Sequence, residues 1–239
     1  MHLLNISLIF TLFFALSACS SSTENMKIYQ SDDQALVQKL PKDGLSIQYL
    51  GVGGHLFRFG SSAIMTAPSI TNPSFWLLGP FMPISPDTDM IDEFLPDVSV
   101  VESILVGHAH YDHLMDVPYI MQEKAPNAQV FGSATMAHSI APAISKDRRH
   151  ALNDTMAILE KPGSWHYNQS KTIRFMAIKS THAPHFMGIN IMTGNYQEDL
   201  EQLPWHAFGW KEGQTLSYLI DFLGPQEETL QRVYYQDAA

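Results

Sequence analysis

The chain has 239 residues, of which 45% are hydrophobic and 11% aromatic, so it can bury the core of one domain. Its formal net charge of -10 argues against sequence-independent binding of nucleic acid, because contacts to phosphates require clustered lysine and arginine. The single cysteine excludes a disulfide within the chain.

The N-terminus has the pattern of an export signal. Residues 3–16 are almost wholly apolar, about the length of a signal-peptide core and too short to span a bilayer, although no lysine or arginine precedes them. The next residues, Leu-Ser-Ala-Cys ending at Cys19, resemble the lipobox of bacterial lipoproteins. This resemblance implies a signal peptide over residues 1–18 and lipidation of Cys19. An ordinary signal or an uncleaved anchor is the alternative.

Lipidation would place the protein on a membrane, because each buried methylene contributes about 0.8 kcal/mol. Ser20 stands where an aspartate is associated with retention in the inner membrane. The resemblance therefore implies an exported protein, anchored to the cell envelope at the periplasmic face of the outer membrane. Residues 19–38 are polar and serine-rich, as expected of a tether, and residues 39–239 are expected to form the domain.

The first part of the domain is expected to be an antiparallel meander with strands at residues 45–51, 55–60 and 62–67, which are short apolar runs broken by glycines. The proline-rich residues 68–89 then exclude a regular helix and predict an irregular loop. We expect its apolar residues 75–82 to pack on the domain, with a surface that faces substrate or a membrane as the alternative.

Short helices and strands alternate in the rest of the chain. A helix capped by Asp87 is expected to stop at Pro96, and another to cover residues 112–126 despite Pro118. His150 and His166 fall in segments expected to be polar loops. Further apolar runs predict strands at residues 101–107, 128–133, 172–180, 215–222 and 231–237, and a short helix at 133–144.

Histidines crowd behind the strand expected at residues 101–107. In extended chain, residues two apart project the same way, so His108, His110 and Asp112 can converge, and His113 follows where a helix begins. Imidazole nitrogens and a carboxylate oxygen suit zinc and similar first-row metals. Burying these groups together without a cation would leave them unpaired at a high cost. The pattern therefore predicts a metal site.

The segment His-Ala-His-Tyr-Asp-His resembles the H-x-H-x-D-H signature of metallo-β-lactamase-fold hydrolases, and the resemblance extends over about residues 45–239. It implies an α/β fold, the αββα sandwich, with a two-metal site at the edge between the sheets. It also implies that His108 and His110 bind the first metal, and that Asp112 and His113 bind the second. Two zinc ions are expected, with manganese or iron as alternatives.

The same resemblance points to ligands later in the chain. His182 in "STHAPH" matches the third motif of the family and would complete the first metal, whereas His185 would contact substrate. His185 as the ligand in place of His182 is the alternative. Asp237 in "YYQD" matches the context of an aspartate that bridges both metals. Asp221 in "YLIDF" is the alternative bridge, and is otherwise a polar residue near a hairpin turn.

Two departures from the family pattern stand out. Thr66 occupies a position where the family often has an aspartate that supports the site. The family also continues beyond the bridging aspartate to a last histidine ligand, whereas this sequence ends two residues past Asp237. We therefore expect an incomplete second half of the fold, either in a fragment of a longer enzyme or in a natural short form.

The resemblance implies a hydrolase in which a metal-activated water cleaves an ester, a lactone or a phosphodiester, with Asp112 orienting the water. The segments beginning at Leu50 and His206 look like the group of N-acyl phosphatidylethanolamine phospholipase D and related lactonases, which favours a lipid-like substrate over another small molecule. A noncatalytic metal-binding lipoprotein and an amide hydrolase of the β-lactamase type are the alternatives, because a fold does not settle a function.

Overall fold

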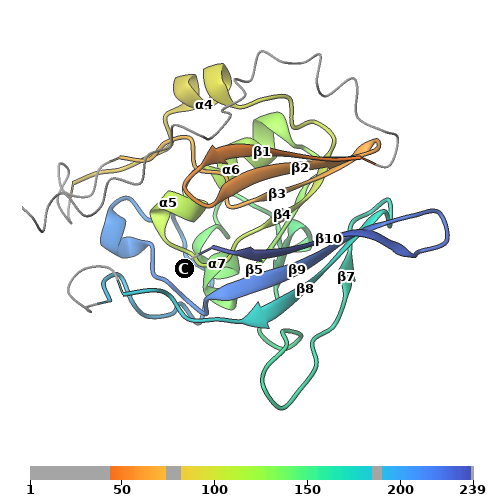
Figure 1. Ribbon diagram of the computed structural model, residues 1–239. Helices are drawn as coiled ribbons and strands as arrows, with labels where there is room; N and C mark the ends of the chain where they lie inside the picture. The colour runs from red at the N-terminus through yellow and green to blue at the C-terminus, as the bar shows by residue number, and fades with distance from the viewer. Residues whose placement is uncertain (1–43, 74–81, 185–189, 238–239) are drawn as a thin grey trace, which may run out of the picture. The chain divides into compact units, whose positions relative to one another are not determined.

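The structure is a computed structural model, and it describes residues 44–73, 82–184 and 190–237 (Figure 1). The chain divides into the units Met1–Lys39 and Leu40–Ala239, and all described residues belong to the second unit. The signal peptide, Cys19, residues 75–81 of the apolar loop and His185 lie outside the described residues. Within the described ranges, no helix is both long and apolar enough to cross a bilayer.

The first sheet has six strands, which are hydrogen-bonded in chain order. They are β1 (Leu45–Gly51), β2 (Gly54–Phe59), β3 (Ser62–Thr66), β4 (Val101–Leu105), β5 (Gln129–Gly132) and β6 (Arg149–Ala151). The expected antiparallel meander of β1, β2 and β3 is confirmed, and from β3 to β6 each strand runs parallel to its neighbour. The parallel half places the ends of β4 and β5 at one edge of the sheet.

The second sheet has four antiparallel strands in the order β10-β9-β8-β7. They are β7 (His166–Tyr167), β8 (Ile173–Lys179), β9 (Leu216–Leu223) and β10 (Thr229–Gln236). Figure 1 shows the end of β10 beside α5 (Tyr111–Leu114), so the last described residues come close to the histidine motif.

Alternation along the strands builds two separate cores. On β2, Leu56 belongs to the core beneath the helices, and its neighbour Phe57 belongs to the core between the two sheets. On β4 the same alternation separates Ile104 from Leu105. Successive side chains of a strand point to opposite faces, so the central strands of the first sheet contribute apolar side chains to both cores.

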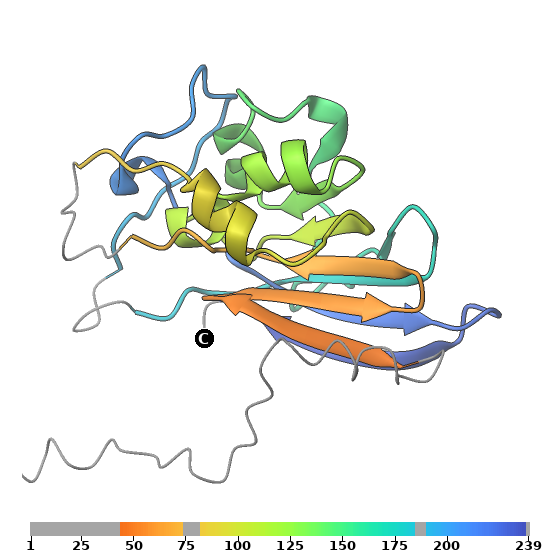
Figure 2. The same cartoon turned by 90° about the horizontal axis from the view of Figure 1, so that it is seen from above.

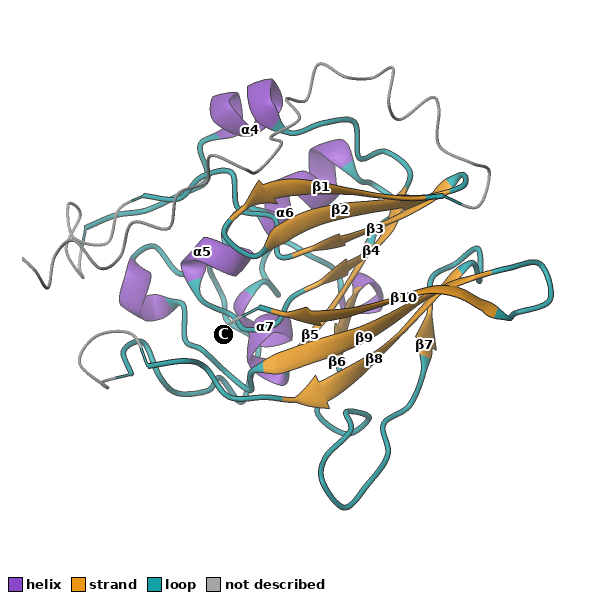
Figure 3. Cartoon of the chain, in the orientation of Figure 1, coloured by secondary structure: helices purple, strands orange, loops and turns teal. Residues whose placement is uncertain are grey.

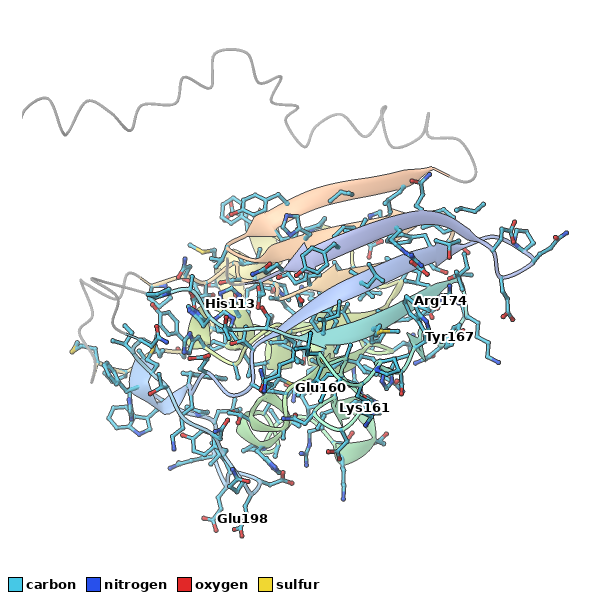
Figure 4. All side chains as sticks on the ribbon, turned by 60° about the horizontal axis from the view of Figure 1, so that its bottom comes forward. His113, Glu160, Lys161, Tyr167, Arg174 and Glu198 are labelled. Carbon is cyan, nitrogen blue, oxygen red and sulfur yellow. The ribbon has the colours of Figure 1, made fainter. Side chains whose placement is uncertain are left out.

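The helices lie together on one face of the six-stranded sheet (Figures 2 and 3). Besides α5 they are α4 (Thr88–Phe94), α6 (Val117–Tyr119) and α7 (Ala134–Ser139). The expected α/β class with two packed sheets is confirmed. Within the described residues, no helix covers the outer face of the four-stranded sheet (Figure 4).

Three local expectations need correction. The helix expected at residues 112–126 is broken into α5, α6 and a π-helical turn at Ile120–Lys124. Pro118 stands at the start of α6, where its missing N–H costs least. The helix expected at residues 133–144 ends at Ser139. His150 and His166 lie on strands β6 and β7 rather than in loops, because pairing with β5 and β8 orders these short segments.

Candidate metal centre

The chain after β4 is held from both sides before it reaches α5. The N–H of Ala109 donates to the carbonyl of Glu212 at 2.9 Å, and the N–H of Leu216 donates to the carbonyl of Gly107 at 2.7 Å. His110 is extended (φ -68°, ψ 157°) immediately before the first turn of α5. The histidine motif is therefore fixed to the segment that leads into β9.

Three imidazoles meet beside this loop. His108, His110 and His182 each have a ring nitrogen within 4.8 Å of those of the other two. The ring centre of His108 lies 4.6 Å from that of His110 and 4.5 Å from that of His182, with interplanar angles of 90° and 87°. His108 and His110 are buried, and His182 is partly exposed. The structure thus brings together the three histidines expected for the first metal.

The surroundings of His108 favour a neutral imidazole, which is the form that binds a metal. Its Nδ1 lies 3.2 Å from Oδ2 of Asp237, and its Nε2 is buried with no hydrogen-bond partner among the described residues. Burial lowers the pKa of His108, and the neighbouring His113 adds to this effect, so the ring is neutral. A proton on Nδ1 that is donated to Asp237 leaves a lone pair on Nε2 for a metal. The donor set therefore fits a cation, which would satisfy this buried nitrogen.

A second group consists of His108, His113 and Asp237, which also offer ligand atoms within 4.8 Å of one another. Oδ1 of Asp237 lies 2.9 Å from Nδ1 of His113. Burial alone would raise the pKa of Asp237, but His113 and His108 hold it well below its usual range. Burial alone would lower the pKa of His113, but the carboxylate of Asp237 outweighs it and raises this pKa. Each of the two groups therefore favours the charged form of the other.

Asp112 lies next to the two histidine groups and belongs to neither. Its Oδ2 is 3.6 Å from Nε2 of His113, and its side chain is 29% exposed. Its expected roles as a ligand of the second metal and as the group that orients water stay predictions.

Asp221 alternates with the β9 side chains that enter the core between the sheets, so it lies on the other face of the second sheet. Its carboxylate accepts hydrogen bonds from Arg174 at 3.0 Å and from Arg232, whose Nη2 donates at 2.8 Å. Figure 4 shows Arg174 far from His113, at the other end of the strands. Asp221 is thus a buried partner of two arginines, and of the two aspartates only Asp237 lies beside the histidines.

Two glycines leave room for Asp237. A Cβ on Gly107 would lie 2.2 Å from the Cβ of Asp237, and a Cβ on Gly53 would lie 2.1 Å from its Oδ1. Real Cβ atoms do not approach other heavy atoms so closely. The sequence analysis did not assign either glycine to the site, because Asp237 meets them through the tertiary fold and local sequence carries no signal of such a contact.

The hydroxyls of Tyr235 and Thr66 both contact the carbonyl of Gly53, and that of Tyr235 also reaches Asp237. Tyr235 Oη lies 2.7 Å from the carbonyl oxygen of Gly53 and also contacts Oδ1 of Asp237. Thr66 Oγ1 donates to the same carbonyl at 2.9 Å and accepts from the N–H of His55 at 3.0 Å. Thr66 therefore supports the Gly53 loop. Tyr235 was not identified from the sequence.

Comparisons with known proteins give matches among solved structures alone. No family model and no curated protein matches this sequence. The metallo hydrolase Igni18 of Ignicoccus hospitalis is 16% identical with a TM-score of 0.44, over 80% of this chain and 60% of that one. A metallo-β-lactamase of Cronobacter sakazakii is 11% identical with a TM-score of 0.40, over 77% of this chain and 58% of that one.

The chain is similar to metallo-β-lactamase-fold hydrolases. CmlA of Streptomyces venezuelae, a diiron β-hydroxylase, is 12% identical with a TM-score of 0.43, over 82% of this chain and 30% of that one. This chain thus spans less than two thirds of the length of each of these three structures.

Proposed function

We propose that this protein is a metal-dependent hydrolase with its reactive centre at His108, His110 and His182. The observation that carries the proposal is the meeting of three imidazoles around the buried Nε2 of His108, which has no hydrogen-bond partner in the described part of the chain. His113 and Asp237, with Asp112 at the edge, would hold a second ion. Nitrogen and oxygen donors of this kind accept zinc, manganese or iron. We favour zinc, for which three imidazoles and one open position are a common catalytic set.

Bound at these residues, a metal would lower the pKa of its water from about 15.7 toward 7 and so would supply a nucleophile at neutral pH. The chain's own groups then have distinct tasks. Asp237 holds the Nδ1 proton of His108 and so fixes the ring for binding through Nε2. Asp112, which is partly exposed and lies 3.6 Å from His113, would take a proton from the attacking water and return it to the leaving oxygen. The result is addition of water across an ester, lactone or phosphodiester bond.

Apolar surface near the site supports a lipid-like substrate. The short turn at Ala207–Gly209 lies beside α5 in Figures 1 and 2. Around it Met82 and Trp205 are each 53% exposed and Phe208 is 38% exposed, and Ile84 is joined to Trp205 by a backbone hydrogen bond of 2.8 Å. An exposed apolar group at the edge of a site suits an amphipathic molecule. Anchoring through Cys19 at the periplasmic face of the outer membrane would bring the domain to such molecules.

A noncatalytic metal-binding lipoprotein is the second candidate, and one observation favours it. Asp112, the only acidic residue expected to move a proton, lies outside both compact groups of ligand atoms. A single ion at the three histidines with no turnover is what this alternative predicts.

Metal analysis combined with hydrolysis assays separates these candidates. The hydrolase should retain two ions per chain and cleave an activated ester, lactone, phosphodiester or amide from a broad panel, and His110→Ala should abolish turnover. His138→Ala is the matched control, because His138 contacts Asp199 on another surface at 2.8 Å. One ion and no turnover would support the noncatalytic candidate. Failure to retain any transition metal would contradict both.

A further inference from the structure

Asp116 is a buried carboxylate that the proposed reaction does not use. It lies between α5 and α6 and is 1% exposed. Its Oδ2 accepts hydrogen bonds from the N–H of Ile70 at 2.8 Å and from that of Thr71 at 2.7 Å. Its Oδ1 is buried and has no hydrogen-bond partner among the described residues. The carboxylate thus joins the end of the histidine motif to the loop that follows β3.

The loop side of this joint is itself braced. Thr71, which gives its N–H to Asp116, accepts at its Oγ1 a hydrogen bond from the N–H of Asp87 at 2.7 Å. Asp87 in turn caps α4 by accepting from the N–H of Met90 at 3.0 Å. Asp116 is therefore hydrogen-bonded to a loop that is itself hydrogen-bonded to the N-terminus of α4. These contacts restrain the position of the loop.

Helix α5 needs such an attachment. It has only four residues, and a single turn is not stable by its own hydrogen bonds. Besides the bonds of Asp116, a hydrogen bond of 3.3 Å joins the hydroxyl of Tyr111 to the carbonyl of Pro73. Both contacts go from the α5 segment to residues 70–73, so the direction of Asp112 and His113 depends on this loop.

Holding a charge at this position works against the stability of the fold. Burial raises the pKa of Asp116 to about 6, although the N–H groups of Thr71 and Ile70 oppose the rise, and the charge of Asp87 adds to it. Above that pH the ionised group remains buried, and its Oδ1 has no hydrogen-bond partner among the residues that the structure describes. What it contributes in return is a pair of charge-assisted hydrogen bonds to the loop.

We propose that Asp116 is a positioning residue, which fixes α5 against residues 70–73 and thereby aims Asp112 and His113 at the second metal. This inference rests on the proposed function, because it assumes that these two side chains meet an ion. It does not require Asp116 to touch either the metal or the substrate.

The test is Asp116→Asn in the full chain, which keeps the size of the side chain and removes its charge. Zinc titration should show an affinity for the second ion that is about 10-fold weaker and an unchanged affinity for the first ion. A loss of this size is typical when a group that orients metal ligands is removed. Thermal unfolding of the metal-free protein at pH 7 should show equal or higher stability, which a purely structural carboxylate would not give. Asp92→Asn is the matched control, since Asp92 is an exposed carboxylate that accepts from Tyr119 at 2.8 Å.

The inference would be overturned if the variant bound both zinc ions with the affinities of the wild type. It would also be overturned if the affinities for the first and the second ion fell by the same factor. A wild type that binds no zinc would instead contradict the proposed function. Amide exchange in the metal-free protein then decides the positioning of α5 by itself. Faster exchange at His113 and Leu114 in Asp116→Asn supports it, because their N–H groups bond to His110 at 3.1 and 3.0 Å, and unchanged rates overturn it.

Discussion

Gly107 lies so close to Asp237 that a Cβ on the glycine would be 2.2 Å from the Cβ of the aspartate. The Cβ of Asp237 is fixed to the backbone, so a change of side-chain rotamer cannot relieve this contact. The last strand can thus deliver its carboxylate to His108 because the residue before His108 has no side chain.

Gly107→Ala should therefore displace Asp237 from the histidines. We expect a loss of stability of about 1–3 kcal/mol, typical of overpacking, together with weaker metal binding. Gly60→Ala is the control, because a Cβ at Gly60 meets nothing within 4 Å and only its φ of 59° opposes the change. Denaturant unfolding and metal titration of both variants measure these effects, and equal metal affinity in Gly107→Ala and the wild type would contradict the account.

Tyr235→Phe removes the hydroxyl that contacts both Gly53 and Asp237. The carbonyl and the carboxylate each lose a buried partner. We therefore expect the free energy of unfolding to fall by about 1–3 kcal/mol and the affinity for the metal to fall several-fold. The adjacent Tyr234 provides a matched control, since it is 57% exposed and its hydroxyl bonds only to Gln236 among the described residues, at 3.2 Å. Tyr234→Phe should change neither quantity. The two variants behaving alike would show that the hydroxyl of Tyr235 has no special role.

Substituting the two aspartates should give opposite results. Asp221→Asn should cost about 1–3 kcal/mol of stability and leave metal content unchanged, because it weakens the pairing of two arginines. The loss is modest because the side chain of Arg232 is 50% exposed and water screens part of its charge. Asp237→Asn should instead lower metal affinity. Loss of metal in Asp221→Asn, with retention in Asp237→Asn, would reverse our assignment.

Stability of the metal-free protein should depend on pH through Asp116. Its pKa is about 6 in the folded chain against 3.8 unfolded, so the folded state holds a proton that the unfolded state has released between these values. The free energy of unfolding therefore falls as pH rises from about 4 to about 6, by about 3 kcal/mol for a pKa raised from 3.8 to about 6. Urea unfolding across this range should show the decline in the wild type relative to Asp116→Asn. Parallel pH profiles for the two proteins would refute it.

Much of the fold could be predicted from the sequence, because its signals are local. The strands from residue 45 to 67 are short apolar runs divided by glycines, and they form the expected meander. Strands β6 and β7 could not be predicted in this way. They are three and two residues long, and only their pairing with β5 and β8 makes them strands.

In the candidate site, too, the residues with a local sequence pattern could be predicted and those that depend on tertiary contacts could not. The spacing of His108, His110 and His113 identifies the motif, whereas Gly107, Gly53 and Tyr235 could not be assigned because their partner is distant in sequence. The alternation of side chains along β9 also distinguishes Asp221 from Asp237. On β9 the inward positions are Leu216, Tyr218, Ile220 and Phe222, which leaves Asp221 facing outward on the opposite parity.

Anomalous X-ray diffraction from crystals of the purified holoprotein tests the central claim most directly, after X-ray fluorescence has identified the metal. We predict a peak at ligand distance, about 2.0–2.1 Å for zinc and nitrogen, from Nε2 of His108 and from a ring nitrogen each of His110 and His182. A crystal without such a peak, or with the metal bound elsewhere and these three imidazoles turned apart, would contradict the account.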